Sequence, residues 1–524
     1  MLDFSGLPRY GSVRPKHVAS AIDQLLGENR ALIARLTAKA TVASWKEFAD
    51  PLENANERLW RAWGVVAHLH AVEDSATIRG AYNANLPKIT RYRTELAQNL
   101  QLYEKFKALR ASMGFEELSQ AQRKIVENDL RDYRLGGAEL EPPSKRRFGE
   151  IQEELAALEA KFSENLLDAT KAFSALIAYR RELLGVPEDV LEAAKEAALQ
   201  DGQEGWKLTL HAPSYGPLMQ YAENRDLREK LYRAHVTRAS EFGNPALDNT
   251  PIIARELRLR KEKAQLLGYK TFAELSLVPK MAESPAAALD FLDDLAARAL
   301  PHARKDYAEM EEFARAELGI QELQVWDIAF ASERLRAKRY AFSDQEVKRY
   351  FPEPQVLEGM FRLVESLYGI RILPDTAETW HPAVRFFRIT DPNEGLIGQF
   401  YVDLYSRETK RGGAWMDEAI TRQRIPGGLR TPVAHLICNF PAPVGNKPAL
   451  YTHDEVMTLF HEFGHGLHHL LSRVDDLGVS GIRGVEWDAV ELPSQFMENF
   501  CWEWGVLTRL TAHVETGEVL PRSL

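Results

Sequence analysis

Apolar residues recur at intervals of three and four along most of the chain, which is the spacing of amphipathic helices. The first clear example begins after Pro15 and runs to Leu36. A longer one covers 144–173, with Ser144 as its candidate N-cap. Its apolar positions form a continuous seam of the kind that packs along another helix. The pattern therefore predicts a mainly helical protein.

Strands are predicted in only a few places, where apolar and polar positions alternate. One is the short segment 206–211. Two more, 384–389 and 396–404, flank the turn-rich loop Asp391–Gly395 and predict a hairpin. A further strand is expected over 431–440. The pattern thus predicts a small sheet directly before residue 450.

The composition and charge of the chain bear on its expected partners and location. The chain has 524 residues, 45% of them hydrophobic and 27% charged, with a net charge of −10. This balance argues against broad electrostatic capture of nucleic acid or of anionic membranes, so we expect neither as a partner. No apolar run is long enough for a membrane helix, and the N-terminus lacks the apolar stretch of a secretory signal. With only two cysteines, Cys438 and Cys501, we expect a cytoplasmic protein.

The chemistry lies in a predicted helix over 453–471. Thr452 and Glu455 fit a capping box, and the helix contains His461-Glu462-Phe463-Gly464-His465, an H-E-x-x-H motif. Histidines four residues apart lie on one face about 6 Å from each other, so both imidazoles can bind one tetrahedral zinc ion. Glu462 follows His461 by about 100° around the helix and can act as the general base on water that the zinc activates. The alternative is a solvated helix face that carries two histidines by chance.

Two glycines add to the motif. Gly464 and Gly466 lie inside the predicted helix, where glycine costs about 0.8–1 kcal/mol relative to alanine. We interpret them as points where another segment approaches the helix closely. The alternative is that they are tolerated surface positions.

A catalytic zinc ion needs a third protein ligand. His468 is one candidate, but it lies seven residues from His461, about 10.5 Å along the helix. A better one is Glu491, in a second helical segment that starts late or kinks at Pro493. Glu498 lies on the same predicted face and could orient a ligand. Spacing alone leaves open a solvated acidic stripe, which is common on helices.

Two further features of the sequence are not interpreted as parts of the metal site. His435 lies within the predicted strand 431–440, and we interpret it as a strand residue rather than a metal ligand. The segment 403–411 is interpreted as a charged hairpin loop.

Several longer blocks of sequence are distinctive in combination with the motif. They are LTLHAPSYGPLMQYAENRDLREKLYRAHVTRAS, FYVDLYSRETKRGGAW, THDEVMTLFHEFGHGLHH and GVSGIRGVEWDAVELPSQFMENF. On these blocks the chain resembles the thimet oligopeptidase family of zinc metallopeptidases, over essentially its whole length.

The resemblance implies a fold and a site. The fold would be mainly α, an elongated zincin-type metallopeptidase with a deep channel and a small β-sheet next to the zinc helix. Residues 1–220 would form an N-terminal helical domain and one channel wall, and 221–524 the zinc peptidase catalytic domain. The zinc ligands fall on His461, His465 and Glu491, and the general base on Glu462. We expect one Zn²⁺ per chain and no other cofactor.

The resemblance also implies a function. We expect a monomeric zinc metalloendopeptidase that hydrolyses short oligopeptides, among them signal-peptide fragments and degradation products. Family members usually continue well past the second zinc-ligand block, into a loop whose tyrosine and histidine stabilise the oxyanion. This sequence ends at Leu524, so we expect that loop and the C-terminal part of the catalytic domain to be missing from it.

Three alternatives remain open from the sequence. The first is a peptidyl-dipeptidase of the same family, which releases C-terminal dipeptides. The second is a catalytically incomplete remnant that binds zinc and peptides. The third is a helical scaffold without a metal.

Overall fold

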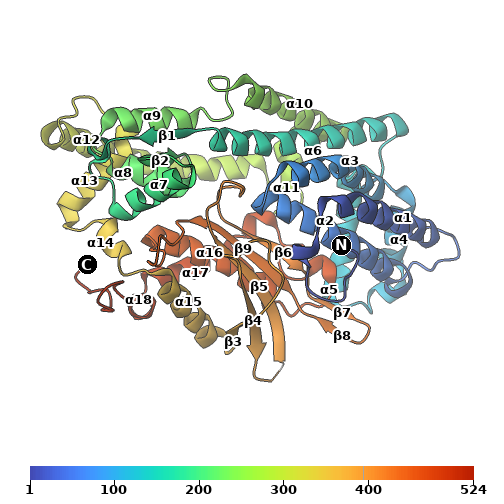
Figure 1. Ribbon diagram of the computed structural model, residues 1–524. Helices are drawn as coiled ribbons and strands as arrows, with labels where there is room; N and C mark the ends of the chain where they lie inside the picture. Colours follow the sequence, from blue (N-terminus) through green and yellow to red (C-terminus); the bar gives the residue numbers. More distant parts are fainter. Residues whose placement is uncertain (394) are drawn as a thin grey trace.

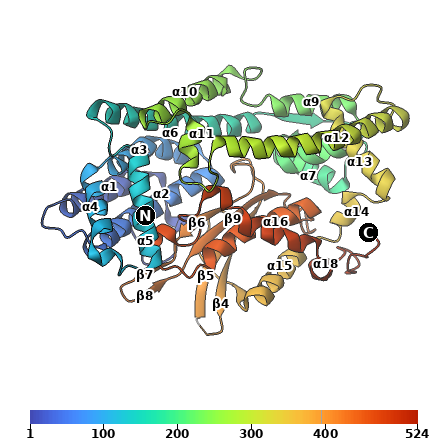
Figure 2. The same cartoon turned by 180° about the vertical axis from the view of Figure 1, so that it is seen from behind.

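The computed structural model describes residues 1–393 and 395–524. Figure 1 shows long helices in an upper layer, and a twisted sheet with helix α16 in a lower one. The N-terminal helices lie at one end of both layers. Figure 2, from behind, shows the same two layers, with α12 and α6 above and the sheet below. The mainly helical fold with a small sheet is therefore confirmed.

The helices of the first half of the chain are α1 (Val18–Leu36), α2 (Asp50–Val72), α3 (Ala76–Ala97), α4 (Leu100–Ala111), α5 (Gln120–Leu135), α6 (Pro142–Lys171), α7 (Glu188–Gln200), α8 (Ala212–Tyr221), α9 (Arg225–Val236) and α10 (Thr250–Leu266). Those of the second half are α11 (Phe272–Leu277), α12 (Pro285–Glu317), α13 (Ile328–Tyr340), α14 (Asp344–Lys348), α15 (Glu353–Tyr368), α16 (His453–Leu470), α17 (Leu492–Glu498) and α18 (Trp504–Leu510). None of the described helices is long and apolar enough to cross a membrane.

The strands are β1 (Ser174–Ile177), β2 (Trp206–Thr209), β3 (Arg371–Pro374), β4 (Arg385–Asp391), β5 (Gly395–Tyr405), β6 (Trp415–Ile420), β7 (Gln423–Ile425), β8 (Gly428–Arg430) and β9 (Val433–Phe440). The main sheet has the order β3-β4-β5-β9-β6. β5 and β9 pair in parallel, and the other neighbours are antiparallel.

The predicted helices are found with shifted ends. The first one begins at Val18 and ends at Leu36. The long helix α6 begins at Pro142, with Glu141 as its N-cap, so the prediction of Ser144 as N-cap is wrong. Proline is favoured in the first helical turn because its fixed φ suits the helix and its missing N–H would have no partner there.

The predicted strands are confirmed, but their partners were not all foreseen. β4 and β5 form the expected hairpin, whose loop includes Glu394, a residue outside the described ones. β2 pairs with β1, and β9 pairs with β6 at the edge of the sheet. Neither β1 nor β6 shows a strong alternation of apolar and polar residues in the sequence. β1 alternates in burial, but its exposed face carries the apolar Leu176, and most positions of β6 are half-buried.

The largest hydrophobic core lies between the main sheet and α15 and α16. α16 packs directly on β9, and Gly466 allows this, since a Cβ there would lie 2.9 Å from the side chain of Leu436. The predicted close approach at Gly466 is confirmed. The core therefore fixes the position of α16 against the sheet.

The segment 403–411 joins the sheet to the N-terminal helices. Asp403 and Lys410 are fully buried and form an ion pair of 2.9 Å. The prediction of a hairpin loop is wrong, because β9 lies between β5 and β6 in the sheet. Arg407 binds Asp403 and also donates to the carbonyl oxygen of Val72, at the end of α2. The charges are satisfied inside the protein, which is the condition for burying them. α2 is thereby held beside β6 and β9.

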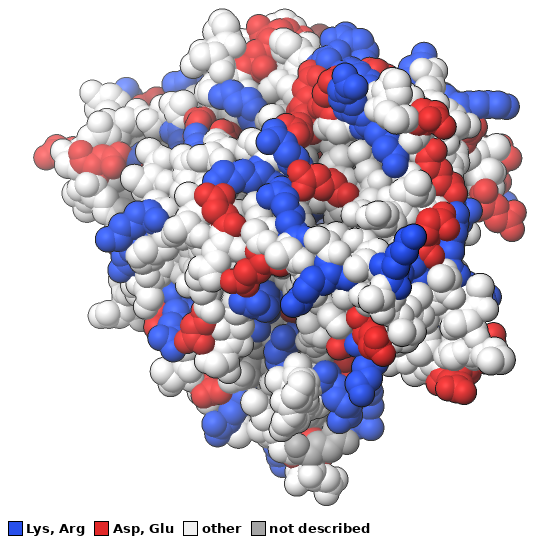
Figure 3. Space-filling model, turned by 90° about the vertical axis from the view of Figure 1, so that its right-hand side faces the viewer, with Lys and Arg blue, Asp and Glu red and all other residues white. Residues whose placement is uncertain are grey.

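Acidic and basic side chains are interspersed on the face shown in Figure 3. Neither sign covers a large continuous area of that face, in keeping with the mixed composition of the chain.

Candidate metal centre

Helix α16 starts as the sequence predicts. The backbone N–H of Glu455 donates to the Thr452 hydroxyl over 3.2 Å, and the Glu455 carboxylate accepts from the backbone N–H of Thr452 over 2.8 Å. This reciprocal capping box fixes the first turn of the helix. It thereby sets the rotation of every later residue, including the motif histidines.

His461, His465 and Glu491 come together at one point. The Nε2 atoms of His461 and His465 each lie 3.1 Å from the same oxygen, Oε2 of Glu491. Ligand atoms around a tetrahedral zinc ion with bonds near 2.0–2.1 Å are separated by about 3.3 Å. Two imidazoles and one carboxylate at this spacing fit the donor set of a catalytic zinc site.

Close packing of α17 on α16 brings Glu491 to the histidines. A Cβ on Gly464 would lie 2.6 Å from the carbonyl oxygen of Pro493 and from the Cα of Ser494. Only glycine leaves room for backbone at this distance, so the predicted close approach at Gly464 is confirmed. α17 starts late, as predicted from Pro493, with Glu491 as its N-cap residue.

Two neighbours orient the candidate ligands. Nδ1 of His461 lies 2.6 Å from Oε1 of Glu498, and we assign the proton to the nitrogen. This carboxylate fixes the ring so that Nε2 carries the lone pair. The Ser494 hydroxyl donates to Oε2 of Glu491 over 2.9 Å. The orienting role of Glu498 was predicted from the sequence, whereas that of Ser494 was not. The signal that could have identified Ser494 is a hydroxyl residue three positions after the candidate ligand Glu491.

Glu462 lies behind the ligands and is nearly buried, at 6% exposure. The pKa of its carboxyl is raised to about 7; burial is the main cause, and the Glu491 charge adds to the rise. His461 and a hydrogen bond from the backbone of Met416, in β6, lower that pKa. One carboxylate oxygen, Oε2, has no hydrogen-bond partner among the described residues. The side chain is therefore placed between α16 and the edge strand, with a free acceptor.

The cluster is open to solvent on one side. The Glu491 side chain is 51% exposed and that of His461 is 25% exposed. His468 is not part of this group of ligand atoms among the described residues. A substrate carbonyl can therefore approach the three ligands from the open side.

Comparisons with known proteins give the family. The model of peptidase family M3 matches residues 218–524, more than half of the chain. The chain belongs to peptidase family M3. The model of the neurolysin/thimet oligopeptidase N-terminal domain matches residues 22–145. The resemblance to the thimet oligopeptidase family is thus confirmed, and with it the enzyme class, a metallopeptidase of the oligopeptidase type.

The chain is similar to curated relatives over its whole length. It is 48% identical to oligopeptidase A of Haemophilus influenzae over 526 residues, covering 100% of this chain and 77% of that protein. It is 46% identical to oligopeptidase A of Escherichia coli K12, covering 99% of this chain and 77% of the relative. The fold is similar to that of a solved putative oligoendopeptidase F from Bacillus anthracis, with a TM-score of 0.53 at 16% identity, covering 98% of this chain and 74% of the other.

Proposed function

We propose that this protein is a zinc metalloendopeptidase that hydrolyses short peptides. His461, His465 and Glu491 would hold the metal, and Glu462 would act as the general base. The observation that carries the proposal is that Nε2 of each histidine lies 3.1 Å from the same Glu491 oxygen, on the helix that also carries a buried carboxylate. Membership of peptidase family M3 supports the same reaction.

The residues of the chain have separate roles in this reaction. When bound, zinc acts as a Lewis acid toward the peptide carbonyl and lowers the pKa of water. Glu462 accepts the proton of the attacking water and passes it to the leaving amine. Its pKa near 7 suits both steps at neutral pH. Glu498 keeps the His461 lone pair directed at the metal.

The edge strand β6 offers a way to hold a peptide backbone. Among the described residues it pairs with β9 alone in the main sheet, and its Met416 contacts Glu462. A peptide that adds to this edge gains main-chain hydrogen bonds whatever its side chains are. The protein would therefore accept short peptides of many different sequences. The name oligopeptidase A, which these relatives carry, agrees with this.

The wider architecture is part of the proposal. We infer that residues 1–220 form one wall of a substrate channel and 221–524 the other. A hollow of about 1640 Å³ lies between residues of these two parts. α7, α8 and β2 line it from the first, α13 and the segment before α16 line it from the second, and none of the three candidate ligands lines it. A cytoplasmic location fits the free, buried state of both cysteines. A monomer is the oligomeric state that we propose.

The test is cleavage of an internally quenched peptide of about ten residues. It would use this chain with and without a zinc chelator, next to Glu462→Gln. We expect turnover that the chelator abolishes and the variant lacks. The control is Asp454→Asn, an exposed acid on the same helix. Parental turnover by Glu462→Gln would overturn the mechanism.

The same assay separates the alternatives. A peptide with a blocked C-terminus is cleaved by an endopeptidase and spared by a peptidyl-dipeptidase, which needs the free carboxylate. Peptide binding and one bound zinc ion without any turnover would identify the catalytically incomplete remnant. If the protein held no stoichiometric metal after purification without chelator, it would be the helical scaffold without a metal.

A further inference from the structure

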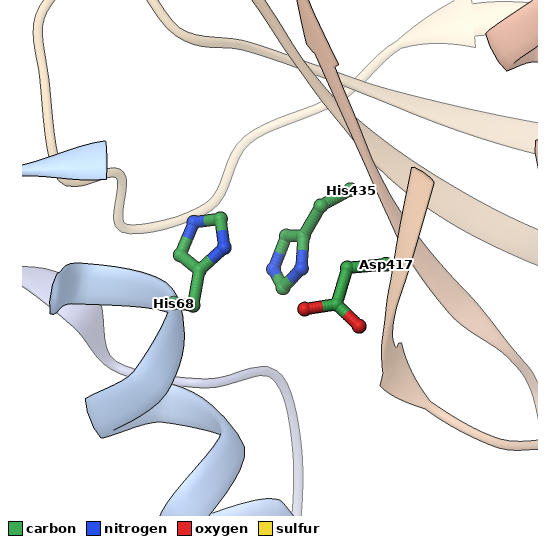
Figure 4. Close-up of side chains that lie close together, drawn as sticks. All are labelled: His68, Asp417 and His435. Carbon is green, nitrogen blue, oxygen red and sulfur yellow. The ribbon is translucent and has the colours of Figure 1, made fainter. Parts of the chain in front are cut away.

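A second group of histidine and carboxylate side chains lies apart from the candidate metal centre. It consists of His68 from α2, His435 from β9 and Asp417 from β6. One possible ligand atom of each lies within 4.8 Å of the others. Figure 4 shows the three side chains pointing toward one another from one helix and two strands.

Both histidines are buried with unsatisfied nitrogens. His68 and His435 are each 2% exposed. Neither ring nitrogen of His68 has a hydrogen-bond partner among the described residues, and the same holds for Nδ1 of His435. Buried polar atoms are nearly always paired with protein, water or an ion, so three such atoms in one place call for a ligand.

The surroundings suit metal binding. Nε2 of His435 lies 2.6 Å from the Tyr10 hydroxyl, which occupies that nitrogen and leaves Nδ1 as the free one. Such a partner on the far nitrogen is what orients imidazole ligands in metal sites. The rings of Tyr10 and Trp380 pack against both histidines and exclude water from that side.

The site also has an entrance. Asp417 is exposed, and together with His435 it lines a cavity of about 600 Å³ that Tyr10 and Trp63 also border. An ion can reach Asp417 and His435 from this cavity and keep water there as further ligands. His68 does not line the cavity, and Arg61, Arg93 and Arg483 are among the residues that do.

We propose that His68, His435 and Asp417 form a second metal site, for a divalent transition ion such as Zn²⁺ or Co²⁺. Two imidazoles and one carboxylate suit these ions better than Mg²⁺ or Ca²⁺, which prefer oxygen ligands. The ion would join α2 to β6, the strand that also contacts Glu462. It would thus link the N-terminal helices to the edge strand proposed to hold the substrate.

Loading requires one ring to turn. The rings of His68 and His435 are stacked, with centroids 3.9 Å apart and an angle of 19° between their planes. Lone pairs lie in the ring planes, so nearly parallel rings do not direct them at one point. His435 is held by Tyr10, whereas His68 has no hydrogen-bond partner among the described residues. His68 is therefore the ring that turns.

The test counts metal ions on the full chain after equilibrium dialysis against micromolar Zn²⁺, and again with Co²⁺. We expect two ions on the parent protein, one on His68→Gln and one on Glu491→Gln. The matched control is His70→Gln, two residues further along α2, which should keep both ions. This outcome does not depend on peptidase activity, so it stands or falls separately from the proposed function.

Asp417→Asn is a second variant, and it should keep the fold because Asp417 is exposed and the change is isosteric. We expect its affinity for the second ion to fall by about tenfold or more, with the first unchanged. Visible absorption of bound Co²⁺ reports the two sites separately. One ion on the folded parent, with the same count on His68→Gln, would overturn the proposal. Equal loss in His70→Gln would also overturn it.

Discussion

The two histidine–carboxylate clusters contain the same residue types but differ in how they are built. His461 and His465 lie on one helix, with ring centroids 5.0 Å apart and 83° between the ring planes, and both contact Glu491. His68 and His435 come from distant parts of the chain and are stacked at 19°. In the first cluster the lone pairs already converge, whereas in the second one ring must turn.

The difference is one of preorganisation. A site whose ligands are already aligned binds its ion without the cost of rearranging buried side chains. Glu498 and the α16–α17 contact hold the first cluster in its aligned form. In the second, the Tyr10 hydroxyl bonds to His435 and the backbone N–H of Glu418 donates to Asp417, while His68 has no hydrogen-bond partner among the described residues. We therefore expect the first cluster to bind zinc more tightly than the second.

The largest expected effect comes from Glu462→Gln, which removes the general base and leaves all three ligands. Peptide turnover should fall by about 10²- to 10⁴-fold, the usual contribution of a positioned base. Zinc content, measured on the same sample, should stay at the parental level. If turnover and zinc were lost together, Glu462 would belong to the metal-holding group instead.

Glu498→Gln should act on the first cluster alone. Loss of the charged acceptor at 2.6 Å from His461 Nδ1 should weaken zinc binding by about 10- to 100-fold. Competition with a coloured chelator measures this affinity. Glu503→Gln, a nearby acid outside the cluster, is the control and should change nothing. An unchanged affinity in Glu498→Gln would show that helix packing alone orients His461.

Gly464→Ala tests the helix contact that brings Glu491 to the histidines. A Cβ 2.6 Å from the backbone of Pro493 and Ser494 forces α17 outward, and overpacking of this kind costs about 1–3 kcal/mol. We expect a lower free energy of unfolding and weaker zinc binding. Gly27→Ala, in α1 with open space around it, should be neutral or stabilising. Equal effects in both variants would mean that helix propensity, rather than the contact, is being measured.

The smallest effect should come from Tyr10→Phe, which removes the hydroxyl that holds His435. A single hydrogen bond contributes about 0.5–1.5 kcal/mol, so affinity at the second cluster should fall only a few-fold. Zinc affinity at His461 and His465 should not change. Cobalt absorption, which distinguishes the two environments, is the measurement. A change at both clusters would mean that they are coupled through β6.

The sequence by itself determined most of the first cluster. The capping box, the H-E-x-x-H spacing and the helical period place His461, Glu462 and His465 by local rules alone. The strands before residue 450 could be predicted for the same reason, since alternation and turn residues are local signals. Gly464 and Gly466 even indicated where other segments approach α16, because glycine inside a helix has a cost that calls for a reason.

Tertiary structure alone decided the rest. Glu491 could be distinguished from a solvated acid only through the packing of α17 on α16, or through the family resemblance. Asp403 and Lys410 were interpreted as parts of a charged hairpin loop, because the contacts that bury them involve α2, far away in the chain. Local patterns carry no information about which distant segments meet. That is why His435 was interpreted as an ordinary strand residue, and why its meeting with His68 and Asp417 needed the fold.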